Sequence, residues 1–345
     1  MAYTTIDDPS AHFQTATYTG NITDDRAITN DGNSDLQPDL IWFKNRATTN
    51  SHNVLDSTRG ITARLRPDDT SAEASTATRL KSFDSDGMTI STDPSVNGDG
   101  NGMVAWQWKA NGGTTTSGGG TDSVSTSAHQ ANTTAGFSIV TYTGNDTAGA
   151  TVAHGLGVVP STIIVKDREQ VKNWNIYHKS IDGTPENFTI RLNNTDAKLD
   201  TPANGWNDTA PTSSVFSIGD GSQVNSNGIT YVAYCFTEIQ GYSKFGSYTG
   251  NGNADGPFVY TGFKPAWVMV KKSDGTEPWT IYDNKRDSAT GNPNNKGLYA
   301  NINDVENDAS GRYKDFLSNG FKVRGDSGEQ NADGETYIYA AFAEN

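Results

Sequence analysis

The sequence is poor in cysteine, leucine and glutamate. Its 345 residues include one cysteine, Cys235, ten leucines and nine glutamates. A single cysteine excludes an intrachain disulfide, and the scarcity of two strong helix formers argues against a mainly helical protein or a coiled coil. Thr, Gly and Asn instead supply 42, 36 and 32 residues. Because Thr favours strands and Gly and Asn favour turns, the composition predicts an all-β protein with many short strands.

Clustered basic residues and long apolar runs are also missing. The net charge is −14 and no run of Lys or Arg occurs, which argues against nucleic acid and anionic membranes as partners. No apolar run approaches the roughly 20 residues of a transmembrane helix. The acidic start, Met1–Asp8, lacks the pattern of a signal peptide. We therefore expect synthesis in a cytoplasm, no membrane insertion, and exit from the cell within a particle or by lysis.

The chain repeats itself three times. The motif Tyr-Thr-Gly-Asn begins at residues 18, 142 and 248, and a proline follows each copy, after which the three copies stay in register without a gap. The prolines are Pro38, Pro160 and Pro265; six residues later come Lys44, Lys166 and Lys271, fourteen later His52, Trp174 and Trp279, and eighteen later Asp56, His178 and Asp283. Each copy closes on an apolar strand, at 103–108, 231–236 and 337–342.

This pattern predicts three tandem β-sandwich domains, jelly-roll or lectin-like, of about 100 residues each. After an N-terminal segment, 1–12, they span 13–110, 136–239 and 240–345. Residues 111–135 have the Gly/Ser/Thr composition of a flexible linker. We therefore expect the first repeat on a tether and the other two packed as a pair. On the closing strand of the second repeat, Val232, Tyr234 and Phe236 share one face, which we expect to be core.

The candidate ligand-binding residues are Trp206, Asn207 and Asp208. They lie in a polar stretch, Asn204–Asp208, and an exposed ring flanked by Asn and Asp could stack on a sugar and bind its hydroxyls. The alternative is a tryptophan that folds back over the end of the sandwich. The other tryptophans fall on predicted strands, where a core role is favoured.

The three lysines that follow apolar strands could form a repeated anion site. The favoured interpretation is a charged strand end that discourages sheet-to-sheet aggregation. Asp-rich turns, such as Asp84–Gly87, could hold Ca²⁺ weakly but are favoured as plain turns. No other cofactor is expected.

Catalytic motifs are scarce. Gly325–Gly328 reads Gly-Asp-Ser-Gly, as around a protease nucleophile, but no suitable histidine setting accompanies it and a turn is favoured. The five histidines lack the spacing of zinc ligands. We therefore predict no catalytic centre.

Longer strings of residues resemble a repeat domain of unknown function in virion proteins of marine tailed bacteriophages, including cyanophages. The matching strings are 42–46, 55–60, 82–87, 104–110, 245–251 and 315–321, which touch all three repeats. The resemblance implies a non-enzymatic structural protein of the virion, such as a tail fibre or another receptor-binding appendage. A capsid-decorating or head-fibre protein and a glycan-binding adhesion module are the alternatives, with a polysaccharide depolymerase a third.

The expected partners follow from the same interpretation. They are other virion proteins, further copies of this chain and a host surface glycan. Because each predicted core is small, we expect a homo-oligomer, with a trimer favoured.

Overall fold

The structure is a computed structural model that describes residues 4–118, 122–124, 126–201, 203–287, 291–308 and 311–344. Helical structure in these residues is limited to η1 (Pro9–Ala11), α1 (Pro94–Asn97), η2 (Pro185–Asn187) and α2 (Gly328–Asn331). The strands pair antiparallel in several sheets, which confirms the predicted all-β sandwich class. No helix within the described ranges is long and apolar enough to cross a bilayer.

Each repeat contributes an inner sheet with the same strand order. In the first repeat the order is β1 (Phe13–Thr19), β9 (Gly102–Trp108), β3 (Leu40–Asn45) and β4 (Asn53–Asp56). In the second it is β12 (Phe137–Thr143), β19 (Thr230–Phe236), β14 (Thr162–Asp167), β15 (Trp174–His178), β16 (Phe188–Arg191) and β17 (Leu199–Asp200). In the third it is β20 (Ser243–Thr249), β28 (Thr336–Phe342), β22 (Trp267–Lys272), β23 (Thr280–Asp283), β24 (Lys296–Tyr299) and β25 (Asn307–Asp308).

A smaller outer sheet completes each sandwich. The outer sheets are β2 (Arg26–Ile28), β8 (Gly87–Ile90) and β7 (Leu80–Asp84); β13 (Ala150–Ala153) and β18 (Val215–Ile218); and β21 (Asp255–Tyr260), β27 (Gly320–Arg324) and β26 (Tyr313–Leu317). A two-residue ladder, β5 (Ala63–Arg64) with β6 (Ala74–Ser75), lies in the first repeat. The ungapped sequence match therefore corresponds to equal strand pairing in three units.

The inner strands are apolar on both faces. On β19, Val232, Tyr234 and Phe236 point to one cluster of buried residues, whereas Tyr231 and Cys235 point to another. The second cluster fills the sandwich of the same repeat. The first is shared by all three repeats, so the predicted core face is confirmed as buried. Burial on both faces explains why these strands are nearly continuous apolar runs.

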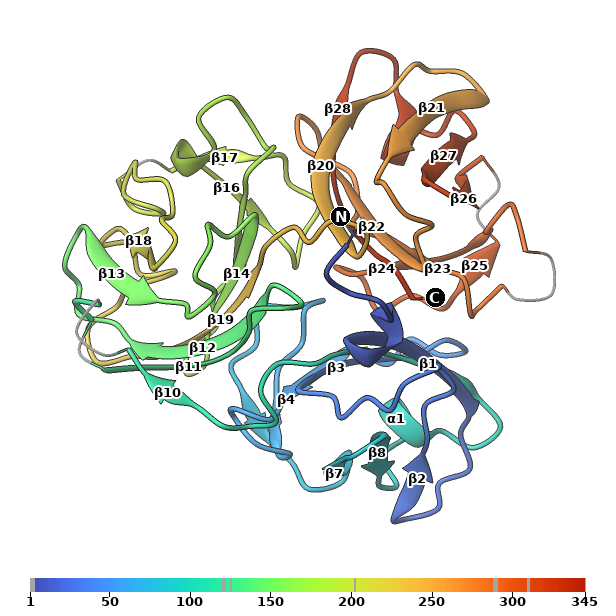
Figure 1. The fold of residues 1–345 in the computed structure, drawn as a ribbon, viewed down its shortest axis with the longest axis horizontal. Coiled ribbons are helices and arrows are strands. Elements are labelled where there is room, and N and C mark those ends of the chain that lie inside the picture. The colour runs from blue at the N-terminus through green and yellow to red at the C-terminus, as the bar shows by residue number, and fades with distance from the viewer. Residues whose placement is uncertain are drawn as a thin grey trace.

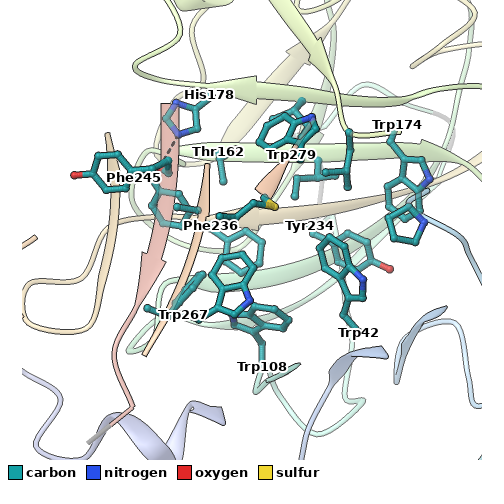
Figure 2. A pocket seen from close by; sticks show the side chains of 18 of the residues that line it. Trp42, Trp108, Thr162, Trp174, His178, Tyr234, Phe236, Phe245, Trp267 and Trp279 are labelled. Atoms are coloured by element: carbon teal, nitrogen blue, oxygen red, sulfur yellow. Dashed lines mark hydrogen bonds between the residues drawn. The ribbon is translucent and has the colours of Figure 1, made fainter. Parts of the chain in front are cut away.

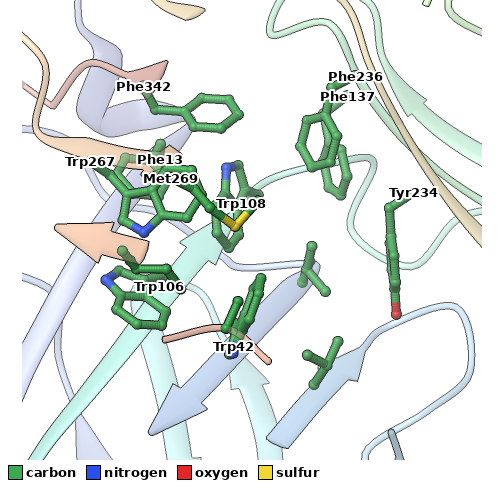
Figure 3. Close-up of a cluster of buried hydrophobic side chains, with 14 of the residues drawn as sticks. Phe13, Trp42, Trp106, Trp108, Phe137, Tyr234, Phe236, Trp267, Met269 and Phe342 are labelled. Carbon is green, nitrogen blue, oxygen red and sulfur yellow. The ribbon is translucent and has the colours of Figure 1, made fainter. Parts of the chain in front are cut away.

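The three repeats surround one common centre (Figure 1). Equivalent residues at the ends of β9, β19 and β28, which are Trp108, Phe236 and Phe342, meet there. The ring centroid of Trp108 lies 6.3 Å from that of Phe236 and 5.7 Å from that of Phe342, and the other two rings are 5.7 Å apart. Figure 3 shows this aromatic cluster, to which strands of every repeat contribute.

The shared centre differs from the expected arrangement of separate sandwiches. The repeats resemble the three subunits of a trimer, but one chain supplies all of them. The expectation of a homotrimer rested on small cores that needed further burial. Because the central cluster supplies that burial within the chain, this reason for a homotrimer no longer holds.

The expected linker also differs from the structure. Within residues 111–135 lie β10 (Thr116–Ser117) and β11 (Thr126–Asn132), and β11 pairs with β12 along its whole length. The side chain of Gln130 on β11 donates to Ser57 Oγ (2.8 Å) and accepts from the backbone N–H of Gly113 (3.0 Å). The segment therefore extends the second repeat's inner sheet and is bound to the first repeat, which is not on a free tether.

The Tyr-Thr-Gly-Asn motif recurs because it makes the same contacts each time. In the second copy, Tyr142 OH donates to the Val224 carbonyl (2.7 Å), and the backbone N–H of Asn145 donates to Oδ1 of buried Asn225 (2.9 Å). A Cβ on Gly144 would collide with the carbonyl of Ser226. The equivalent tyrosines, asparagines and glycines of the other copies make corresponding contacts. The motif therefore ties β1, β12 and β20 to the loop before each closing strand.

A buried ion-pair network closes the boundary between the third and first repeats. Arg286 Nε lies 2.5 Å from Asp283 Oδ2, and both side chains are fully buried. Glu306 accepts from Arg286 (2.8 Å) and from Arg46 of the first repeat (2.6 Å). Asp283 also accepts a hydrogen bond from Nε1 of Trp106 (2.9 Å), another residue of the first repeat.

The boundary between the first and second repeats has the same network. Here Arg59 pairs with Asp56 (2.6 Å), and Glu73 bridges Arg59 (2.7 Å) and Arg168 (2.8 Å). Asp56 accepts from the hydroxyl of Tyr234 (2.7 Å), which is equivalent to Trp106. Two of the three boundaries between repeats are therefore held by the same buried ion-pair network.

The boundary between the second and third repeats replaces this network. His178 and Ile181 stand in place of the aspartate and arginine, and Ser273 in place of the second arginine. Lys198 occupies the position of the bridging glutamate. Its backbone N–H donates to the backbone carbonyl of Ser273 (2.8 Å), just as the backbone N–H of Glu73 donates to the carbonyl of Arg168. Its Nζ lies 3.0 Å from Asp274 of the third repeat. At this boundary the bridging residue is therefore the cation and its partner in the next repeat is the carboxylate.

Candidate functional site

Trp206 is not an exposed platform for a sugar. Its side chain is buried in the second repeat's sandwich, where its ring meets that of Tyr177 edge-on with centroids 5.9 Å apart. The indole N–H donates to the carbonyl of Phe188 (3.1 Å). Asn207 and Asp208 continue the turn beside it with φ values of 55° and 46°. The predicted glycan contact at Trp206, Asn207 and Asp208 is therefore corrected, because the ring has folded back over the sandwich.

The three repeated lysines are interior. Lys44, Lys166 and Lys271 are all buried, and each Nζ donates to backbone carbonyls of the loop that follows its own strand. Lys44 and Lys271 also reach a carbonyl of the neighbouring repeat, at Asn303 (3.1 Å) and Thr195 (3.2 Å). Burial lowers the pKa of each lysine to about 8. The predicted charged strand end in water is therefore wrong, because the amines are buried. The alternative of an anion site does not fit either, because backbone carbonyls already accept hydrogen bonds from the amines.

His178 serves the boundary between the second and third repeats. Its Nε2 lies 3.2 Å from the carbonyl of Tyr339 in the third repeat, and its Nδ1 accepts from the backbone N–H of Ser180 (3.2 Å). One nitrogen donates and the other accepts, so the ring is neutral. The residue of the third repeat equivalent to Tyr234 and Trp106 is Ala340, which has no polar group for an aspartate to bind. Histidine therefore binds the backbone instead.

We expect His178 to make the protein sensitive to mild acid. Burial lowers the pKa of His178 to about 4, below its unfolded value of about 6.5. The unfolded chain then binds more protons between these values, so stability falls as the pH drops through this window. Between pH 7 and pH 5 the wild type should lose about 2 kcal/mol more than His178→Gln does. Urea unfolding at both pH values measures this, and equal losses would contradict it.

The Gly-Asp-Ser-Gly stretch bends at Gly325 and leads into α2, which begins at Gly328. Ser327 caps α2, its hydroxyl accepting from the backbone N–H of Glu329 (3.4 Å). Among the residues that the structure describes, no group of three or more His, Cys, Asp or Glu side chains could hold a metal ion. In the Asp-rich turn, Asp84 and Asp86 accept hydrogen bonds from Thr89 and from the Leu36 backbone.

A small apolar cavity of about 60 Å³ lies at the common centre (Figure 2). Residues from all three repeats line it, including Trp42, Ile164, Trp267 and Ala340. Its walls are nearly all carbon. Ala340 replaces the larger Trp106 and Tyr234 of the equivalent strands, so the cavity marks the place where the threefold pattern lacks one large side chain. Because the cavity is small and lies within the core, we interpret it as a packing defect and not as a binding site for a large substrate.

Filling this cavity should stabilise the protein. Ala340→Leu adds carbon atoms where the structure has empty space, and such changes commonly raise the free energy of unfolding by about 0.5–2 kcal/mol. Urea unfolding of the variant measures the change. A loss of stability would show that the cavity walls cannot accept the larger side chain.

The third sandwich contains a buried lysine that the sequence analysis missed. Lys314 pairs with Val323 across β26 and β27, in the place where Leu80 pairs with Ile90 in the first repeat. Its Nζ contacts Oε1 of Gln330 and lies 4.2 Å from the centroid of the Tyr282 ring. Burial lowers its pKa well below the usual value. The amine is enclosed by the sandwich, so it does not form a site open to a substrate.

Strand β21, on the outer sheet of the third repeat, lies at the rim of that lobe (Figure 1), and it carries a pair of exposed aromatic residues. Phe258 and Tyr260 on β21 are 45% and 61% exposed, and they are the only exposed large aromatic side chains in the described part of the chain. The residue between them, Val259, faces the sandwich core. Sequence analysis missed this pair, because residues 257–260 read Pro-Phe-Val-Tyr and no alternation of polar and apolar residues marks a solvent-facing side.

Comparison with known proteins gives one family. A family model described as a domain of unknown function, DUF7483, matches residues 8–345. No curated protein matches the chain. The match includes all three repeats, the central cluster and the exposed aromatic pair. The chain therefore belongs to the DUF7483 family.

Proposed function

We propose that this protein is a non-enzymatic structural protein on the surface of a tailed-phage virion, where it forms part of an appendage such as a receptor-binding fibre. Its partners are other virion proteins, and further copies of the chain can join it there. The proposal rests on the resemblance of its repeats to phage virion proteins. Placement on the capsid as a decorating or head-fibre protein is the alternative within the same class.

One structural observation supports a structural role. The charged residues that recur in register are used in contacts within and between repeats, as Arg59, Arg286, Lys44 and Lys271 illustrate. A single chain thereby forms a three-lobed body in which buried residues of all three repeats share one core. A virion component benefits from such a body, because it must hold its shape outside the cell.

Labelling of intact particles tests the proposed place. Antibodies against the purified protein, coupled to gold, are applied to purified virions that carry this chain and examined by electron microscopy. Label at the tail is the expected result, and label on the capsid would favour the decorating alternative. A chain that remains in the lysate and is missing from purified virions would contradict the proposal.

Incubation with host polysaccharide tests the non-enzymatic part. The purified protein is incubated with host capsule or lipopolysaccharide, and reducing ends are measured. We expect no increase over buffer. An increase that disappears on replacement of a single side chain would identify a depolymerase instead.

A further inference from the structure

We propose that the outer face of the third repeat binds uncharged sugar residues. The face is formed by Phe258 and Tyr260 on β21, Lys322 and Arg324 on β27, and Asp315 on β26. It belongs to a different repeat from the Trp206 turn, which lies in the second sandwich. The inference does not depend on where the protein sits on a particle.

The first argument is the contrast between equivalent strands. In the third repeat Phe258 pairs with Lys322, and Tyr260 pairs with Gly320. The residue in the place of Phe258 is Ala27 in the first repeat and Thr151 in the second, judged by their pairing with Thr89 and Ser217. Of the three outer sheets, only the third thus turns two aromatic rings to solvent, where they do not gain the free energy of apolar burial.

The second argument is that one ring packs on the backbone of the neighbouring strand. A Cβ on Gly320 would lie 2.9 Å from Cζ of Phe258, so the phenyl ring lies against the bare backbone of β27. Residues two apart on a strand are about 7 Å apart, so the two rings lie next to each other along β21. A ring that already packs on the backbone on one side has fewer orientations to lose when a ligand stacks on it. Sugars offer the matching surface, since the C–H groups of a pyranose ring form flat apolar faces.

The third argument is the charge of the face. Lys322 Nζ lies 2.9 Å from Asp255, and Arg324 Nε lies 3.2 Å from Asp315. Two cations and two carboxylates neutralise each other, which leaves polar groups for hydroxyls and no surplus charge for an acidic sugar. The hydrogen bond from Lys322 lowers the pKa of Asp255, so this carboxylate remains an acceptor at neutral pH.

The fourth argument is the adjoining hollow. Asp255 and Arg324 also line a depression of about 420 Å³ at the end of the sheet, with Tyr313 and Asp326. A sugar chain stacked on the two rings could continue into it. A protein partner fits less well, because two half-exposed aromatic side chains offer far less than the roughly 1,000 Å² that a stable protein interface buries.

Affinity electrophoresis of the full chain tests the proposal. Native gels contain one polysaccharide each: the neutral laminarin, mannan or dextran, or the anionic alginate or chondroitin sulfate. We expect retardation by at least one neutral polysaccharide. Phe258→Ala and Tyr260→Ala should each raise the dissociation constant about tenfold, as the loss of a central aromatic contact does. Phe258→Trp should retain binding.

Val171→Ala is the matched control, because it also truncates an exposed apolar side chain, 73% exposed, but in the second repeat. Its retardation should equal that of the wild type. Circular dichroism of each variant confirms that it is folded. The proposal is contradicted if no polysaccharide in the panel retards the wild type, if only the anionic ones do, or if both alanine variants bind as the wild type does. None of these results bears on the presence of the chain in virions.

Discussion

Arg286→Ala should lower the free energy of unfolding by about 3–5 kcal/mol, which is the usual loss when one partner of a buried ion pair is removed. The guanidinium is fully buried, pairs with Asp283 and Glu306, and donates to the backbone carbonyl of Ile281 (3.0 Å). Its removal leaves two carboxylates in the interior without their shared cation. Because these groups join the third repeat to the first, the loss should appear in urea unfolding of the whole chain.

An exposed ion pair provides the control. Lys81 pairs with Asp24 at 3.1 Å, and the two side chains are 34% and 48% exposed. Lys81→Ala should change the free energy of unfolding by less than about 1 kcal/mol, as surface pairs do. If Arg286→Ala is equally mild, the network does not hold the third repeat to the first.

Trp267→Ala should cost about 3–5 kcal/mol, the range for truncation of a large buried aromatic. The indole of Trp267 belongs to the third repeat, but its ring centroid lies 6.4 Å from that of Trp106 and 5.7 Å from that of Trp108, both in the first. The variant therefore opens a cavity in the shared centre. Thermal and urea unfolding measure the loss.

Val171→Ala serves here too, because a truncation at an exposed site should lie within about 0.5 kcal/mol of the wild type. A loss of under 1 kcal/mol for Trp267→Ala would contradict the account, since a ring buried among three repeats cannot be removed without cost. Melting of the third repeat alone in this variant would likewise show that the repeats are independent.

Much of the fold could be predicted because the repeats constrain one another. The ungapped match after the three prolines predicted three equivalent sandwiches, and in the structure Trp42, Ile164 and Met269 face Trp106, Tyr234 and Ala340 respectively. The apolar face of the closing strand was also predicted as core. Its second apolar face, with Tyr231 and Cys235, was the sign that each inner sheet has neighbours on both sides.

The shared centre could not be predicted, since periodicity along a strand says that a face is buried but not what covers it. The same limit affected the lysines. A lysine after an apolar strand usually places its amine in water, whereas the loop carbonyls that receive Lys44 are brought together only by folding. The Ser/Thr-rich segment around Gln130 had the composition of a linker, and its pairing with β12 overrode that preference.

The candidate site was misplaced for a related reason. Polar neighbours suggested that Trp206 is exposed, but the turn folds inward and the Phe188 carbonyl satisfies the indole N–H. The exposed pair Phe258 and Tyr260 lies in a stretch, Pro-Phe-Val-Tyr at 257–260, without polar residues on either face, so the sequence did not reveal which face is turned to solvent. Comparison of the three outer sheets resolves this in the structure.

The central claim is that three sequence repeats fold as one cooperative body around a common aromatic centre. Differential scanning calorimetry of the full chain tests it most directly, because it counts the units that unfold together. We predict a single transition with equal calorimetric and van't Hoff enthalpies. Two or three separable transitions, with a calorimetric enthalpy well above the van't Hoff value, would show that the sandwiches unfold as independent domains and would contradict the account.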